Sequence, residues 1–317
     1  MTRRLTPDQI DQAAALLRAG ELVAFPTETV YGLGARADDD LAVAKVFEAK
    51  TRPRFNPLIV HVPSLERAQE LAVFDACALR LAETFWPGPL TLVLPLREGA
   101  RVSDLITAGN DTVAIRVPAN PLALKLLQEV GVGVAAPSAN ISGQVSPTTA
   151  DHVLEGLSGR IAAVLDGGPC TVGLESTIVM TEPPALLRPG GLDRAALETQ
   201  LGQKLALPEL NSDAPNAPGQ LTSHYAPGAA VRLHAEGRLP DEVLLGFGDA
   251  QGADLNLSPA GDLREAAANL FAMLRRIDQI AAEQGATTIA VSPIPEHGLG
   301  QAINDRLRRA AAPRLQA

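Results

Sequence analysis

The chain has 317 residues, of which 46% are hydrophobic and 20% are charged, which is enough to bury the cores of two domains. Its formal net charge of -9 argues against a protein that coats nucleic acid non-specifically, because such binding depends on Lys and Arg neutralising phosphates. An aromatic content of 3% also disfavours binding that depends on base stacking. We therefore expect a globular protein with a small, charged, phosphate-bearing ligand.

The first two-thirds of the chain alternates between helical and strand patterns. Thr6 to Gln9 form a predicted capping box with Pro7 at the first helical position, and Gly20 suits the end of that helix. A buried strand is predicted over residues 22–25, followed by a loop rich in Thr and Gly. Further helices are predicted over residues 41–49, 65–71 and 76–84, and further strands over residues 58–62, 90–94, 113–117, 133–136, 161–165 and 177–179. Apolar strands separated by helices indicate an α/β domain with a mixed, twisted sheet.

The composition changes over residues 207–228, where four prolines interrupt regular structure. This segment is predicted to link a first domain, residues 1–206, to a smaller α/β domain, residues 229–317. In the smaller domain, strands are predicted over residues 231–233, 242–247 and 288–291, and helices over residues 263–283 and 301–310.

The amino terminus and the cysteines give no sign of export. No apolar run reaches the roughly 18 residues of a membrane span, and the first four residues lead into a polar helix start rather than a signal peptide. Cys77 and Cys170 lie far apart without a CxxC or His-rich context, so neither a disulfide framework nor a zinc site is predicted. A cytoplasmic location away from membranes is the expectation.

Two stretches of small and polar residues follow predicted strands. PTETVYGLG, residues 26–34, supplies hydroxyls, a carboxylate and glycines, and the stretch around Ser138 and Asn140 supplies donors for phosphate oxygens. Ligands of open α/β sheets gather where strands end. From the residues alone, a plain turn explains either stretch about as well.

Positively charged residues are clustered in one predicted loop and also occur inside an apolar strand. Lys50, Arg52 and Arg54 fall within five positions of a predicted loop, where a triphosphate would neutralise them, although a solvated basic loop is the alternative. Arg116 lies inside an apolar strand and needs either a ligand carboxylate or a structural ion pair. His61 also lies in an apolar strand, where a structural core histidine is the usual explanation.

Four motifs in this order resemble the YrdC-like domain of threonylcarbamoyl-AMP synthases. They are PTETVYGLG (residues 26–34), KTRP (residues 50–53), NPLIVH (residues 56–61) and PSAN (residues 137–140). The resemblance covers about residues 5–205, and PGQLTSHYAP, residues 218–227, looks like the joint of the longer, two-domain members. It implies a YrdC-like twisted mixed sheet with an open concave site, linked to a smaller Rossmann-like α/β domain.

The resemblance also implies an activity. Threonine, bicarbonate and ATP would yield threonylcarbamoyl-AMP and pyrophosphate, a nucleotidyltransferase reaction in the biosynthesis of threonylcarbamoyladenosine next to the tRNA anticodon. Mg²⁺ would enter with ATP, held mainly by its phosphates, and no organic prosthetic group is expected. The product would pass to a tRNA threonylcarbamoyl transferase complex, and a weak contact with tRNA is a further expectation.

The resemblance assigns roles to individual positions. The expected threonine contacts are Thr29, His61, Arg116, Ala136 and Ser176. The expected ATP contacts are Arg52, Asn56, Thr112, Ser138, Ser146, Arg188 and Tyr225. The expected catalytic residues are Lys50, Arg52, Ser138 and Asn140. Tyr225 would make the linker fold over the site as a lid, whereas Gln220 and Leu221 replace a Met-Lys-type pair of many longer members, which removes the basis for a linker lysine contact.

Two other functions are compatible with these residues. One is an RNA-binding module that uses a basic concavity of the same fold. The other is an enzyme that forms a different carbamoyl adenylate, although such chains carry additional zinc-finger or kinase-like domains that are not found here. The whole set of cations and hydroxyls favours catalysis, and the acidic net charge disfavours general RNA binding.

Overall fold

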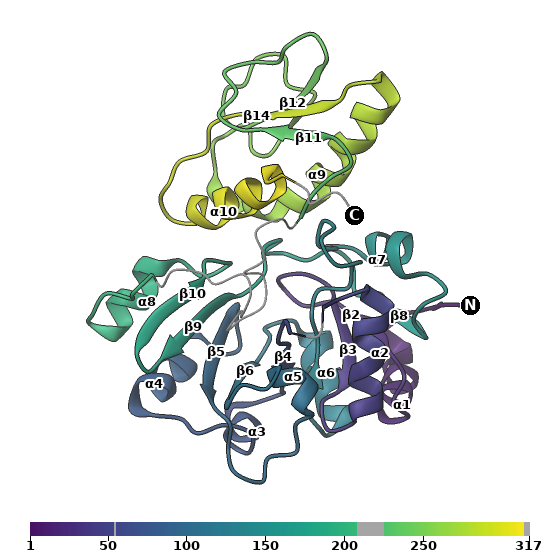
Figure 1. Ribbon diagram of the computed structural model, residues 1–317, viewed down its shortest axis with the longest axis vertical. Coiled ribbons are helices and arrows are strands. Elements are labelled where there is room, and N and C mark those ends of the chain that lie inside the picture. The colour runs from purple at the N-terminus through teal and green to yellow at the C-terminus, as the bar shows by residue number, and fades with distance from the viewer. Residues whose placement is uncertain (54, 208–224, 314–317) are drawn as a thin grey trace.

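The computed structural model describes residues 1–53, 55–207 and 225–313. In these residues, ten strands form one mixed sheet in the order β1-β8-β2-β3-β7-β4-β6-β5-β9-β10. The strands are β1 (Arg3–Leu5), β2 (Val23–Phe25), β3 (Gly32–Arg36), β4 (Ile59–His61), β5 (Leu90–Pro95), β6 (Thr112–Arg116), β7 (Val134–Ala135), β8 (Ala163–Leu165), β9 (Thr177–Thr181) and β10 (Pro184–Arg188). Figure 1 shows this sheet in the larger, lower unit of the molecule.

Helices connect these strands, and most of them begin at a side-chain cap. They are a 3-10 turn (Pro7–Gln9), α1 (Ile10–Arg18), α2 (Asp40–Lys50), α3 (Leu65–Gln69), α4 (Ala76–Phe85), α5 (Asp104–Thr107), α6 (Pro121–Val130), α7 (Ala150–Leu157) and α8 (Arg194–Leu201). The predicted capping box is confirmed, since the Gln9 side chain accepts a hydrogen bond from the Thr6 amide at 3.0 Å. Asn120 likewise accepts from two amides at the start of α6.

Both faces of the sheet are buried, and successive side chains of a strand alternate between them. Successive residues of β2 point to opposite sides, so Val23 and Phe25 join the hydrophobic cluster that contains α1 and α6, and Ala24 joins the cluster that contains α2 and α4. The prediction of an α/β domain with a mixed sheet is thereby confirmed.

One predicted loop is a strand. The sequence predicts that residues 32–34 continue the Thr- and Gly-rich loop, but they begin β3, which pairs antiparallel with β2. The glycines allow this close packing, because a Cβ on Gly34 would lie 3.0 Å from the Phe25 ring and from the Val23 carbonyl oxygen. The turn between the two strands is therefore short, and it holds Thr27 and Thr29 next to the sheet.

A smaller parallel sheet follows, in the order β11-β14-β12-β13. Its elements are β11 (Ala230–Arg232), β12 (Glu242–Gly246), β13 (Leu255–Asn256), α9 (Leu263–Gln284), β14 (Thr288–Val291) and α10 (Gly300–Ala311). Helices α9 and α10 lie on the side of this sheet that faces the larger unit (Figure 1). Val30, Val145 and Leu174 of the larger unit belong to the same hydrophobic cluster as α9 and α10, so the two units share a packed interface.

The predicted linker falls mostly outside the described residues, which resume at Tyr225. The predicted boundaries at residues 206 and 228 stay predictions. In the part of the chain that the structure describes, no helix combines the length and the apolar character needed to cross a membrane.

Candidate functional site

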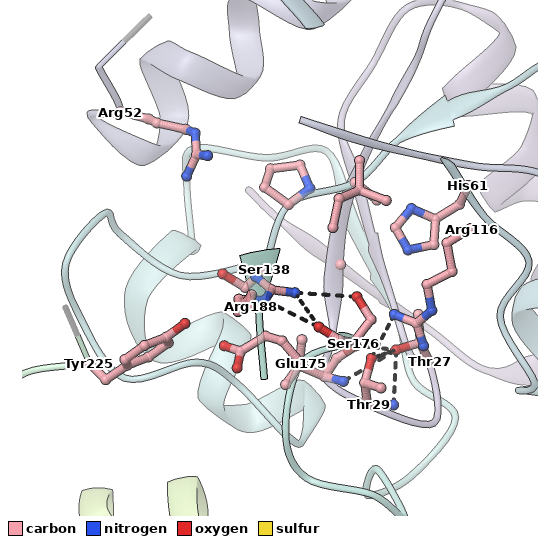
Figure 2. Close-up of a pocket in the computed structure, with 15 residues that line it drawn as sticks. Thr27, Thr29, Arg52, His61, Arg116, Ser138, Glu175, Ser176, Arg188 and Tyr225 are labelled. Atoms are coloured by element: carbon pink, nitrogen blue, oxygen red, sulfur yellow. Dashed lines mark hydrogen bonds between the residues drawn. The ribbon is translucent and has the colours of Figure 1, made fainter. Parts of the chain in front are cut away.

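A pocket lies over one face of the large sheet. The register pairs His61 of β4 with Arg116 of β6, and Ile59 with Ala114, so the side chains of these rows stand on one face. The residues that line the pocket are Thr27, Thr29, Val30, Gly32, Arg52, Ile59, His61, Arg116, Ala136, Pro137, Ser138, Glu175, Ser176, Arg188 and Tyr225. Figure 2 shows His61, Arg116 and Thr29 at one end of it, Tyr225 and Arg52 at the other, and Glu175 between them.

Arg116 closes the first end with a buried ion pair. Its Nη2 lies 2.6 Å from Oε1 of Glu28, and its Nη1 donates to the Thr29 hydroxyl at 2.9 Å. Glu28 also accepts from the Ala119 amide at 3.1 Å. The structural ion pair that the sequence left open therefore exists, and it fixes the guanidinium at the pocket wall.

His61 lies next to Arg116 in the neighbouring strand and is 3% exposed. Burial, reinforced by the charge of Arg116, lowers the pKa of His61 to about 3, so the ring is neutral at physiological pH. Its Nδ1 has no hydrogen-bond partner within the described residues. A neutral ring with a free nitrogen beside a cation suits a polar or carboxylate-bearing ligand.

Ser176 lies on the floor of the pocket, in contact with Arg188, with which the other end begins. The Ser176 hydroxyl lies 2.7 Å from that of Thr91, and Arg188 donates to the Ser176 carbonyl at 2.8 Å and to its hydroxyl at 3.2 Å. Burial lowers the pKa of Arg188 to about 10, so it remains a cation at neutral pH. The two residues, expected to contact threonine and ATP respectively, are thus in direct contact.

Lys50 is not a loop residue, which corrects the prediction. It is the last residue of α2, is 1% exposed, and donates to the carbonyls of Ser138 and Asn140 at 2.5 Å each. Burial, with the nearby charge of Arg52, lowers its pKa well below the ordinary lysine value. Helix α2 extends through Lys50 because it is Thr51, with a left-handed φ of 52°, that ends the helix. Lys50 therefore fixes the stretch around Ser138 without lining the pocket itself.

Arg52 reaches the pocket from the segment after α2. It donates to the Pro57 carbonyl at 3.0 Å, and burial lowers its pKa to about 10, so it stays charged at neutral pH. Asn56, from the same segment, is 1% exposed and its side-chain amide has no partner among the described residues. Arg54, the third cation of this run, lies outside the described residues.

Tyr225 closes the other end, and Glu175 lies between the two ends (Figure 2). Tyr225 is 1% exposed and stacks on Phe271 of α9, with ring centroids 5.3 Å apart. Glu175 accepts from the Ser146 hydroxyl at 2.6 Å and pairs with Arg306 of α10 at 3.0 Å. Helices of the smaller unit therefore support this wall of the pocket.

The predicted site residues divide into two groups. Those that line the pocket are Thr29, Arg52, His61, Arg116, Ala136, Ser138, Ser176, Arg188 and Tyr225. Those that do not line it are Lys50, Asn56, Thr112, Asn140 and Ser146. Thr112 stands on the same face of β6 as Arg116 but four residues before it, about 13 Å along the strand. Asn140 donates to the carbonyls of Ile141 and Gln144 and shapes its own turn.

Sequence reasoning missed the roles of two carboxylates. The carboxylate of Glu28 is part of the motif over residues 26–34, but no partner is predicted for it, and Glu175 directly precedes the predicted site residue Ser176. The signal that could have identified them is that each is a charged residue close to an apolar strand. Arg306 had no such signal, because it lies in an ordinary amphipathic helix.

Comparison with known proteins identifies the family. Residues 15–190 match the Sua5_yciO_yrdC family model, described as "Telomere recombination", and residues 192–312 match the threonylcarbamoyl-AMP synthase C-terminal domain. A threonylcarbamoyl-AMP synthase of Pyrococcus abyssi is 43% identical over 98% of this chain and 96% of its own length.

The chain belongs to the threonylcarbamoyl-AMP synthase family. The synthase of Bacillus subtilis is also 43% identical, over 97% of this chain and 94% of its own. The crystal structure of P. abyssi Sua5 complexed with L-threonine has a TM-score of 0.89 at 41% identity and covers 98% of this chain and 97% of that one. The predicted family, fold and synthase function are confirmed by these matches.

Proposed function

We propose that this protein makes threonylcarbamoyl-AMP by nucleotidyl transfer, from L-threonine, bicarbonate and ATP, with release of pyrophosphate. The observation that carries the proposal is that one pocket joins an end built on Arg116 and His61 to an end built on Arg52 and Arg188. The first suits a small carboxylate, and the second suits a polyanion.

The threonine end holds the amino acid. Arg116, fixed by Glu28, would pair with the threonine carboxylate, and the neutral His61 and the hydroxyls of Thr29 and Ser176 offer further hydrogen bonds. The threonine amine then attacks bicarbonate carbon and water leaves, which gives a carbamate. Because Arg116 is already held in place, little conformational freedom is lost when the ligand binds.

The nucleotide end places ATP against that carbamate. A carbamate oxygen attacks the α-phosphorus, the bond to the β-phosphate oxygen breaks, and pyrophosphate leaves. Arg52 and Arg188 would balance the charge of the phosphates, and Ser138, held by Lys50, would donate to them. Positioning and charge stabilisation then account for most of the rate, as in other phosphoryl transfers.

Magnesium would reach the pocket on the phosphates of ATP. No group of three or more His, Cys, Asp or Glu side chains in the described ranges could hold a metal ion, so the chain offers no dedicated cage there. Mg²⁺ supplies neutralisation of the phosphate charge when it is bound. The protein's own share is the set of arginines at the nucleotide end.

The wider role follows from the product. An acyl adenylate is reactive, so we expect it to pass to the enzyme complex that transfers threonylcarbamoyl to tRNA, in the cytoplasm. Tyr225 would lie over the nucleotide and close the pocket, which makes the predicted linker part of the site. A weak contact with tRNA belongs to the same proposal.

Product identification with labelled bicarbonate tests the reaction. Purified protein is incubated with ATP, Mg²⁺, L-threonine and ¹³C-bicarbonate. The nucleotide products are then separated, and their masses are measured by mass spectrometry. We expect an AMP adduct of threonine that contains one labelled carbon, and none when threonine is omitted. An adduct without the label, or no adduct, would refute the proposed reaction.

A further inference from the structure

Arg306 of α10 reaches from the smaller unit to the wall of the pocket. Its side chain is fully buried, and its Nε lies 3.0 Å from Oε2 of Glu175. Its Nη1 donates to the Pro189 carbonyl at 2.6 Å and pairs with Asp305 at 2.9 Å. A buried arginine with this many partners is held in one orientation.

Each partner in the larger unit is connected to one of the predicted ATP contacts. Glu175 accepts from the Ser146 hydroxyl at 2.6 Å, and Pro189 directly follows Arg188. The guanidinium of Arg306 also lies over the Tyr225 ring, with its carbon 5.6 Å from the ring centroid. One side chain of the second domain therefore touches or supports three of the predicted ATP contacts.

Glu175 poses an electrostatic problem that Arg306 solves. Its carboxylate lines the pocket, where an unbalanced negative charge would repel a triphosphate. Burial works to raise the pKa of Glu175, but Arg306 and then Arg188 outweigh it, and the pKa stays below its usual value. The carboxylate is thus ionised and needs its partner.

We propose that Arg306 is a positioning residue for ATP, through which the second domain balances Glu175 and sets the affinity of the pocket for the nucleotide. The inference rests on the proposed function, because it takes this end of the pocket as the ATP site. Arg306 does not line the pocket itself. Its effect passes through Glu175 and Tyr225.

A replacement of Arg306 should therefore act on one substrate only. In Arg306→Met, the buried Glu175 carboxylate loses its partner and faces the phosphates. The threonine end is held by Arg116 and Glu28, which make no hydrogen bond or ion pair with Arg306. The expected result is a KM for ATP raised about tenfold or more, while threonine binding changes less than about twofold.

The double variant separates balance of charge from simple loss of structure. Glu175→Gln combined with Arg306→Met removes both charges, and the amide can still accept from Ser146. We expect this pair to recover an ATP KM within about threefold of the wild type. Arg308→Met is the matched control, because Arg308 lies on the same helix and pairs with Glu296 at 2.8 Å, but is half exposed. Its ATP KM should equal that of the wild type.

The experiment measures pyrophosphate release by each full-length variant against ATP concentration, with threonine binding followed by calorimetry and folding by thermal unfolding. A folded Arg306→Met protein with the wild-type ATP KM would overturn the inference, as would a double variant no better than the single one. If Arg306→Met does not fold, Arg306→Gln decides: its amide can still donate to the Pro189 carbonyl but carries no charge, so a several-fold rise in the ATP KM supports the inference and an unchanged ATP KM overturns it.

The wild-type protein distinguishes the two proposals. If it releases no pyrophosphate in response to threonine, the proposed function fails, and the role of Arg306 fails with it. If the wild type is active and Arg306→Met matches it in ATP KM, only the inference about Arg306 is wrong.

Discussion

At the scale of single residues, the partners of Arg116 and His61 decide what these side chains can do. The sequence showed that a cation inside an apolar strand needs a partner, but it could not choose between a ligand and an ion pair. The structure pairs Arg116 with Glu28 and leaves it on the pocket wall, so the ion pair is confirmed and the contact with a ligand carboxylate stays a proposal. The choice depended on a turn that brings Glu28 to a strand 88 residues away.

His61 should make the protein less stable as the pH falls. Its pKa in the folded protein, about 3, lies below the unfolded value near 6.5, so the unfolded state binds more protons between these values. Its contribution is therefore fully present above pH 6.5 and is lost as the pH falls toward 3. Chemical unfolding at pH 6 and pH 5 should show wild-type stability falling about 1 kcal/mol more than that of His61→Asn.

The comparison between the two proteins isolates His61. His152, whose pKa is also lowered by burial, is present in both and adds the same slope to each. Equal losses of stability in the wild type and His61→Asn would contradict a buried, neutral His61.

At the scale of elements, periodicity predicted most strands of the large sheet and helices α1 to α4, but not β1, β10 or helices α5 to α8. It missed β3 because Gly32 and Gly34 carry no side chains to show an alternating pattern, and it placed Lys50 in a loop because a run of cations resembles a solvated segment. The end of α2 depends on the left-handed Thr51, a conformation that its side chain does not indicate. The residues of the site could therefore be predicted from the sequence, but the buried position of Lys50 that supports them could not.

The position of Lys50 changes what its replacement should do. In Lys50→Met, the carbonyls of Ser138 and Asn140 lose their buried donor, so the free energy of unfolding should fall by about 2 kcal/mol or more. Urea unfolding measures this. Lys45→Met, on the same helix, removes a half-exposed lysine that pairs with Glu21, and should change stability by less than about 1 kcal/mol.

If Lys50→Met unfolds at the wild-type urea concentration, Lys50 does not support the Ser138 stretch as its contacts indicate.

At the scale of the whole molecule, the two units form one hydrophobic interface. Val30, Val145 and Leu174 of the larger unit pack with Tyr225, Phe271 and other residues of the smaller one. The motifs of the first domain could be identified from the sequence, as could a second α/β unit. The contact between Glu175 and Arg306 could not, because 131 residues separate them and neither position carries a local signal for the other.

A chain cut after Ala206 should therefore lose activity. It would expose the apolar side chains of that interface and lack Tyr225 and Arg306, which close the nucleotide end. We expect the shortened chain to release pyrophosphate far more slowly than the full chain. Equal rates would make the second domain an accessory.

Pyrophosphate release by the full chain, with ATP, Mg²⁺ and bicarbonate present, tests the central claim most directly. If the pocket joins threonine to ATP, adding L-threonine should raise the rate by on the order of tenfold or more. The same rate with and without threonine would contradict the account.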